Sequence, residues 1–215
     1  MDKRQEMQLR QLMDRYPQLQ PCWQAMTEAY ELLEATFCNG GKLLVCGNGG
    51  SASDAEHIVG ELMKEFRLKR KIYASHAEAL KAIDREMGTI LSENLQGALP
   101  AISLTGHSSL TTAFMNDALP ELVFAQQVNG YGQQGDAFLG ISTSGNSHNV
   151  LYAAVTAKAN GLKVIGLTGQ RSNRLMDFAD VCIRVPEVDT YKVQELHLPV
   201  YHCICMMLED KFFGE

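Results

Sequence analysis

One unit occurs three times in this sequence: a short apolar run, a loop of glycine and hydroxyl residues, and then a helical segment. In chain order the runs and their loops are 42–46 with GNGGS (47–51), 136–141 with STSGNS (142–147) and 163–167 with TGQRSN (168–173). Apolar strands that alternate with helices are typical of a parallel sheet covered on both faces. Further apolar runs at 101–104 and 181–185 bring the expected sheet to about five strands.

Right-handed crossovers between such strands predict a doubly wound α/β fold of the flavodoxin-like kind. We expect helices at 51–66, 147–160 and 190–212 within one domain that spans residues 1–215. Ligands of doubly wound sheets bind at the carboxyl ends of the strands, which is where all three loops lie.

Two additions to the repeated unit are predicted. Residues 1–40 contain a pair of amphipathic helices, 2–16 and 21–39, whose apolar stripes must pack against the main domain or another copy of the chain. Residues 67–97 form a charged helical insertion, in which a capping box at 75–78 opens a helix that runs to Met87. A surface insertion is the plainer interpretation of this segment, and a substrate lid is the alternative. The basic triplet at 69–71 is interpreted as a solvated face.

The charge balance and the apolar runs exclude several classes of protein. The chain has 25 acidic and 19 basic residues and a net charge of -6, so we do not expect nucleic acid as a partner. No apolar stretch approaches the roughly 18 residues of a membrane helix, and no secretory signal is apparent. The six cysteines form no CxxC pair and are interpreted as reduced, buried thiols of a cytoplasmic protein.

The loops carry the first indication of a ligand. A glycine- and serine-rich turn at a helix start presents free backbone N–H groups to an anion. GNGGS lacks the spacing of a dinucleotide-binding loop and the Gly-Lys-Ser/Thr of a P-loop. The hydroxyls of STSGNS suit a phosphate monoester, although plain helix capping would use the same residues. Two such loops in one sheet therefore indicate a phosphorylated small molecule.

A second cluster has the residue types of a metal or acid–base site. His57 and Glu61 are four residues apart on one predicted helix and therefore share a face. This spacing is compatible with a metal site, with an acid–base pair or with a simple surface pair. The last helix carries Gln194, Glu195, His197 and His202 in an otherwise apolar segment, where histidines can also be core residues. Gln194 and His202 are roughly 12 Å apart along a straight helix. Both reach one small metal only if Pro199 kinks the helix or if a second subunit contributes, and we favour a site at a subunit interface.

The combination of LLVCGNGGSASDAEHIVGEL, GDAFLGISTSGNSHNV, KVIGLTG and VQELHLPVYH resembles the sedoheptulose 7-phosphate isomerases (phosphoheptose isomerases) of the sugar-isomerase (SIS) fold. The resemblance covers roughly residues 20–66 and 100–212. It implies a homotetramer, with active sites at subunit interfaces, that converts sedoheptulose 7-phosphate to D-glycero-D-manno-heptose 7-phosphate, often with zinc.

The same resemblance implies roles for individual residues. Glu61 and His202 would be the acid–base pair. The implied zinc ligands are His57, Glu61, Gln194 and His202. The implied substrate contacts are Asn48, Gly49, Gly50, Glu61, Asn116, Asp117, Ser142, Thr143, Ser144, Ser147 and Gln194.

Two alternatives share these motifs. One is a non-catalytic SIS protein, either an adaptor or a sugar-phosphate sensor, which would not need Glu61 and His202. The other is an isomerase that acts on a different phosphosugar. Because both proton-moving residue types are present, the sequence favours an enzyme.

Overall fold

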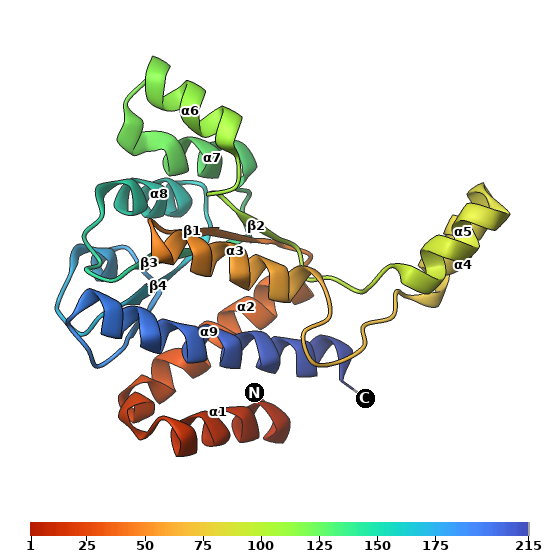
Figure 1. The fold of residues 1–215 in the computed structure, drawn as a ribbon, viewed down its shortest axis with the longest axis horizontal. Helices are drawn as coiled ribbons and strands as arrows, with labels where there is room; N and C mark the ends of the chain where they lie inside the picture. The colour runs from red at the N-terminus through yellow and green to blue at the C-terminus, as the bar shows by residue number, and fades with distance from the viewer. Residues whose placement is uncertain (215) are drawn as a thin grey trace.

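The computed structural model describes residues 1–214 as a parallel sheet with helices on both faces and one helical hairpin that projects from the body (Figure 1). The strands are β1 (Leu43–Cys46), β2 (Ala101–Ser103), β3 (Ala137–Ser142), β4 (Lys163–Thr168) and β5 (Val181–Arg184). The α-helices are α1 (Lys3–Arg15), α2 (Trp23–Cys38), α3 (Gly50–Met63), α4 (Ala74–Ile83), α5 (Arg85–Asn94), α6 (Ser108–Asp117), α7 (Val123–Tyr131), α8 (His148–Ala159) and α9 (Thr190–Phe213). Short 3-10 helices are η1 (Pro17–Cys22), η2 (Pro120–Leu122) and η3 (Arg174–Asp177).

All strand pairs are parallel, and the strand order is β2-β1-β3-β4-β5. The predicted doubly wound fold is therefore confirmed. Leu43 of β1 lies opposite Ala101 on one side and Ala137 on the other, so β1 and β3 are neighbours at the point where the direction of winding reverses. This switch point is where open α/β sheets bind their ligands.

Alternate residues of the central strands β1 and β3 enter two different cores, which explains why these strands are continuously apolar. In β1, Leu43 and Val45 pack on the face covered by α2, α3 and α9, and Leu44 and Cys46 pack on the face covered by α7 and α8. All four side chains are fully buried. Burial of each leucine or valine contributes roughly 1.5–3 kcal/mol.

The N-terminal helices pack within the chain. Leu9, Leu12 and Met13 of α1 join the same core as α9, against which α1 lies, and the stripe of α2 lies in that core too. The predicted start of α2 differs from the structure, because residues 17–22 form a 3-10 helix that contains Pro17 and Pro21. Proline removes the N–H donors that a continuous α-helix needs.

Two predicted helix boundaries were wrong. Helix α3 ends at Met63 rather than at 66, because the N–H groups of Phe66 and Arg67 donate to the carboxylate of Glu209. The insertion contains two helices rather than one that runs to Met87. Asp84 is extended and its side chain accepts from the Met87 N–H, so it ends α4 and caps α5.

Other predictions need smaller corrections. The capping box predicted at 75–78 does not form, since α4 is preceded by Tyr73, which makes no side-chain cap. Helices α6 and α7 were not foreseen. The cysteines are free thiols as predicted, but Cys38 is exposed. Within residues 1–214, no helix has both the length and the apolar character needed to cross a membrane.

His197, which the sequence left open as a core residue or a ligand, lies in the core of α9 with no exposed surface. Within the described chain neither ring nitrogen has a well-formed hydrogen bond, although the Thr168 backbone lies near enough to favour the protonated ring slightly. Desolvation dominates and lowers the pKa of His197 to about 4.

A buried neutral histidine predicts a loss of stability in acid. The unfolded chain takes up a proton near the ordinary histidine pKa of about 6.5, whereas the folded chain resists protonation until about pH 4. The free energy of unfolding should therefore fall by about 3 kcal/mol from this group as the pH drops from 7 to 4. Urea unfolding of His197→Leu should lack that part of the loss. The exposed His76→Leu is the control, and an unchanged pH dependence in His197→Leu would contradict the assignment.

Candidate active site

The two loops at the switch point are tied together by side-chain amides. Asn48 Nδ2 donates to Asn149 Oδ1 at 2.9 Å, and Asn149 Nδ2 donates to Asn48 Oδ1 at 2.8 Å. Gly49 has a φ of 56°, which suits glycine, and it turns the chain into the first residue of α3. The GNGGS loop is thereby fixed against the start of α8, next to STSGNS.

The hydroxyls of STSGNS lie at the end of β3 and the start of α8. Ser142 Oγ accepts from the Gly145 N–H at 3.1 Å and lies 3.1 Å from Ser147 Oγ. Ser147 is the N-cap of α8, yet its side chain forms no capping hydrogen bond within residues 1–214. Plain capping therefore does not explain this serine, and the N–H groups at the start of α8 are available to an anion.

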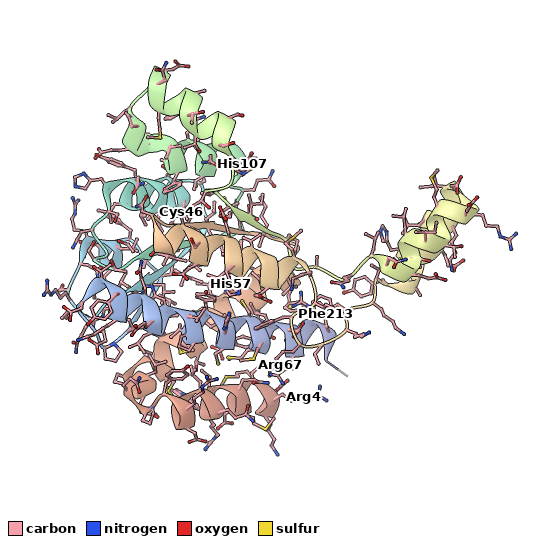
Figure 2. The ribbon with its side chains drawn as sticks, in the orientation of Figure 1. Arg4, Cys46, His57, Arg67, His107 and Phe213 are labelled. Atoms are coloured by element: carbon pink, nitrogen blue, oxygen red, sulfur yellow. The ribbon has the colours of Figure 1, made fainter. Side chains whose placement is uncertain are left out.

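Gln194 of α9 lies directly over the start of α3. A Cβ atom added to Gly50 would come within 2.5 Å of Gln194 Nε2, so the end of the Gln194 side chain lies close to the backbone of Gly50. Further along, His57 lies between α3 and α9 (Figure 2). Helices α3 and α9 run side by side. Gln194 lies beside the GNGGS and STSGNS loops, here called the anion loops, and His202 lies about 12 Å further along α9. Helix α9 continues through Pro199 without a break.

His57, Glu61 and His202 form a chain of polar contacts, here called the acid–base cluster. His57 Nε2 lies 3.1 Å from Glu61 Oε1 and 3.4 Å from His202 Nε2. On its other side, His57 Nδ1 lies 2.9 Å from the Tyr201 hydroxyl, which donates to Asp54 Oδ1 at 3.2 Å. Tyr201 has one proton and gives it to Asp54, so Nδ1 of His57 must donate to Tyr201. A neutral His57 then has its lone pair on Nε2.

This tautomer leaves several electron-rich atoms facing one another. The bare Nε2 of His57 and the carboxylate oxygen of Glu61 repel each other at 3.1 Å unless a proton or a metal cation lies between them. Glu61 is mostly buried, and its Oε2 accepts no hydrogen bond within residues 1–214, although the Lys64 ammonium lies 3.8 Å away. The site therefore attracts a cation.

The surroundings lower the pKa of His202 and raise the pKa values of Asp54 and Tyr201. Burial, and then the charge of His57, lower the pKa of His202, while Glu61 partly opposes them. Burial raises the pKa of Asp54 against the hydrogen bond from Tyr201. Burial and then Asp54 raise the pKa of Tyr201, which therefore stays protonated. A neutral His202 can accept a proton from a bound hydroxyl group.

The implied site residues fall into separate groups within one chain. Glu61 lies eleven residues after Gly50, or about 16 Å along α3, so the acid–base cluster is distant from the anion loops. Asn116 and Asp117 are exposed at the end of α6, which packs against η2 and α7. Asp54 and Tyr201 were missed by the sequence analysis. Their signal was their position, since Asp54 is three residues before His57 and Tyr201 adjoins His202.

The cluster has the donor types of a zinc site, but a metal would require the side chains to rotate. Imidazole nitrogens and a carboxylate oxygen are common zinc ligands. As they stand, no three His, Cys, Asp or Glu side chains of the described chain are arranged to hold a metal ion, because His57 lies between the other two. Gln194 of the same chain is too far along α9 to join them.

Arg70 fixes the end of α3 that carries Glu61. Its guanidinium donates to Glu209 Oε1 and to the carbonyls of Glu61 and Leu62, each at 2.8 Å. The interpretation of the basic triplet as a solvated face was wrong for this residue, because the Arg70 side chain has no exposed surface. Two of its nitrogens donate to carbonyls at a helix end and the third donates to a carboxylate, which the sequence pattern did not reveal.

A cavity of about 470 Å³ opens beside His202. Phe66 and Pro199 contribute its apolar side, while Arg15 and Arg67 contribute guanidinium groups. Of the three cluster residues only His202 lines this cavity, so a polar ligand in it would reach the cluster from the His202 side.

Comparisons with known proteins agree with this architecture. The family model described as SIS domain matches residues 74–169. The phosphoheptose isomerase of Roseiflexus sp. (strain RS-1) is 40% identical over 185 residues, which are 86% of this chain and 81% of that protein. The phosphoheptose isomerase of Synechocystis sp. is 38% identical over 191 residues, 89% of this chain and 85% of that protein. The solved phosphoheptose isomerase of Neisseria gonorrhoeae has a TM-score of 0.70 and 30% identity, covering 96% of this chain and 92% of its own.

The buried Arg70–Glu209 pair gives a prediction for stability. Arg70→Met leaves the Glu209 carboxylate buried without its partner, and we expect the free energy of unfolding to fall by about 3–5 kcal/mol. Arg70→Met combined with Glu209→Leu should recover much of that loss in urea unfolding. Arg10→Met, which removes an exposed pair with Glu6, is the control and should cost at most about 1 kcal/mol. Equal effects in the buried and the exposed pair would contradict the anchoring role.

Proposed function

The chain belongs to the phosphoheptose isomerase family, and we propose that it converts sedoheptulose 7-phosphate to D-glycero-D-manno-heptose 7-phosphate. The membership rests on relatives that match most of both chains. The single structural observation that supports the chemistry is the contact chain of Glu61, His57 and His202, which places a carboxylate and an imidazole within reach of one ligand.

Phosphate binding is the proposed role of the switch-point loops. Ser142, Thr143, Ser144 and Ser147 supply hydroxyls, and the uncapped start of α8 supplies backbone N–H groups. The GNGGS loop, with Asn48, Gly49 and Gly50, forms the opposite wall. Binding the phosphate far from the reacting carbons uses remote binding energy to orient the sugar.

Proton transfer is the proposed role of Glu61 and His202. The Glu61 carboxylate takes the proton from C1 of the ketose, and neutral His202 accepts the O1 proton and delivers it to the C2 oxygen, which gives an enediolate with its charge on O1. Glu61 then returns its proton to C2, the carbonyl group forms at C1, and the aldose results. Tyr201 and Asp54 hold the ring of His57 in one tautomer, which keeps its Nε2 directed at Glu61.

Zinc is the proposed metal, held by His57, Glu61 and His202, with Gln194 from another copy of the chain as a fourth ligand. The orphaned Glu61 Oε2 and the facing lone pairs support a cation at this place. When bound, zinc would polarise the carbonyl group of the sugar and stabilise negative charge on its oxygen.

A composite site between copies follows from the separation within one chain. The anion loops and the acid–base cluster lie about 16 Å apart along α3, and α9 runs through Pro199 as one helix. We therefore propose that the anion loops of one copy and the cluster of a second copy form each active site, in a homotetramer. The exposed Asn116 and Asp117 would contact substrate across the same interface.

The direct test is an assay of the purified protein with a panel of ketose phosphates, before and after removal of zinc with a chelator. We expect turnover of sedoheptulose 7-phosphate, lower turnover after chelation and recovery on adding zinc. Preference for a hexose or pentose phosphate would assign a different substrate within the same chemistry. No turnover with any sugar phosphate, combined with tight binding, would favour a sensor or adaptor.

Replacement of the proposed base gives the second test. Glu61→Gln should lower kcat by at least about 100-fold, because an amide cannot accept the C1 proton, while sugar-phosphate binding stays measurable by calorimetry. Glu65→Gln, four residues further along the chain and outside the cluster, is the control and should retain activity. Substantial turnover in Glu61→Gln would refute the assigned role.

Mixing variants tests the composite site. Glu61→Gln and Ser144→Ala each disable one half of the site, so either alone should have little activity. After unfolding and refolding together in equal amounts, about a quarter of the sites should combine two intact halves, and that share of activity should return. A mixture that stays as inactive as its components would show that each site is built from one chain.

A further inference from the structure

Helices α4 and α5 form a hairpin, here called the arm, that projects from the body of the molecule (Figure 1). The two helices pack closely at Gly88, where an added Cβ atom would meet the Leu80 backbone at 2.5 Å. Within residues 74–94 only Gly88 is buried. The arm therefore contributes nothing to the two cores of the domain.

The arm exposes more apolar surface than a solvated hairpin would need. Ile83 is 86% exposed and Met87 is 66% exposed, and Ile90 and Leu91 are also exposed. Met87, Ile90 and Leu91 follow the three- and four-residue spacing of one helix face, and Leu95 extends it. Ten-residue helices are marginal in water on their own, and the pairing of α4 with α5 leaves this stripe exposed, so it is available to a partner.

The neck of the arm holds it in a defined direction. Lys71 and Gln96 form an antiparallel bridge, and the Gly97 N–H donates to the Arg70 carbonyl at 2.9 Å. The side chain of Gln96 accepts from the Glu65 N–H at 2.8 Å. Because Arg70 is itself anchored by Glu209, the neck is tied to the buried part of the domain.

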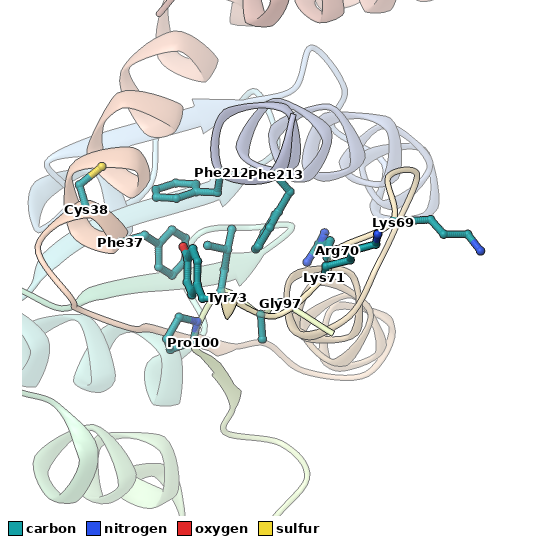
Figure 3. Close-up of a pocket in the computed structure, with 12 residues that line it drawn as sticks. Phe37, Cys38, Lys69, Arg70, Lys71, Tyr73, Gly97, Pro100, Phe212 and Phe213 are labelled. Atoms are coloured by element: carbon teal, nitrogen blue, oxygen red, sulfur yellow. The ribbon is translucent and has the colours of Figure 1, made fainter. Parts of the chain in front are cut away.

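A cavity of about 670 Å³ lies at the root of the arm (Figure 3). Aromatic rings of Phe37, Tyr73 and Phe213 line it, and the exposed Lys69 and Lys71 lie at its edge. Within the described chain, no carboxylate lines this cavity. The root is thus apolar and basic.

The arm is complementary to the root in both respects. Residues 74–94 combine the apolar stripe with four carboxylates and only two side chains of lysine or arginine. The carboxylates are those of Glu78, Asp84, Glu86 and Glu93. The two surfaces lie on one chain, but the arm points away from its own root (Figure 1). A two-fold contact uses such a pair of surfaces twice.

We propose that two copies of this chain exchange arms, the apolar acidic arm of each copy occupying the apolar basic root cavity of the other. Each helix is about 15 Å long, so the tip of one arm reaches the partner's root when the arms lie antiparallel. The insertion is then an assembly device. This inference goes beyond the proposed isomerase activity and does not rest on it.

Paired charge reversals test the exchange. In one variant the root carries Lys69→Glu and Lys71→Glu, and in the other the arm carries Glu86→Lys and Glu93→Lys. Each variant alone places like charges across both contacts, so its mass by light scattering should fall to half that of the unmodified protein. A mixture of the two variants has opposite charges at both contacts and should restore the full mass. Lys158→Glu, a charge reversal at an exposed residue outside the arm and the root, is the control and should leave the mass unchanged.

A cross-link locates the contact. Cys38 is exposed and lines the root cavity. We expect Ile83→Cys to be joined to Cys38 of a second copy by a short bis-maleimide, and the added Cys38→Ser change should abolish the product. Three outcomes would overturn the proposal: unchanged mass in both charge variants, no recovery on mixing, or a cross-link confined to one chain. Sedimentation of the protein with phosphatidylglycerol vesicles that depends on Met87 would assign the stripe to a lipid surface instead.

Discussion

The contact between α3 and α9, which run side by side, positions most of the candidate site residues. Helix α3 begins at the anion loops and ends beside Arg70, and α9 supplies Gln194 at the first end and Glu209 at the second. Between these two ends, His57 contacts both Glu61 and His202. The Arg70–Glu209 pair satisfies the carbonyls at the end of α3 and the N–H groups of the following turn, which fixes one helix against the other. A buried charge pair of this kind specifies position more than it adds stability.

The two groups of side chains along this contact differ in electrostatic character. The loops at the switch point offer hydroxyls and N–H groups at the positive end of helix dipoles, which suits a phosphate. The cluster further along offers lone pairs of His57 and Glu61 in a partly buried setting, which suits a proton or a metal cation. A phosphosugar isomerase needs both environments, because one end of the substrate is held while protons move at the other. Their separation within one chain makes the assembly of copies part of the proposed chemistry.

Much of this was accessible from sequence because it depends on local pattern. The apolar runs predicted the parallel sheet, since residues buried on both faces cannot alternate with polar ones. The loops GNGGS and STSGNS follow β1 and β3, so the carboxyl edge was predictable as the ligand edge. Spacing alone placed His57 and Glu61 on one face. Predicted helix ends were wrong where groups distant in sequence form hydrogen bonds to the backbone. Helix α3 ends at Met63 because the N–H groups of Phe66 and Arg67 donate to the carboxylate of Glu209.

By itself, then, the amino-acid order determined the fold class, the glycine- and hydroxyl-rich loops at the carboxyl edge of the sheet and the placing of His57 and Glu61 on one helix face, because each depends on neighbours within one turn or one strand. Only the tertiary structure decided that Arg70 is a buried anchor rather than a solvated charge, that Tyr201 and Asp54 set the tautomer of His57, and that His197 is a core residue. Those assignments depend on partners far along the chain, and desolvation and hydrogen bonding act through distance in space, which a linear pattern does not contain.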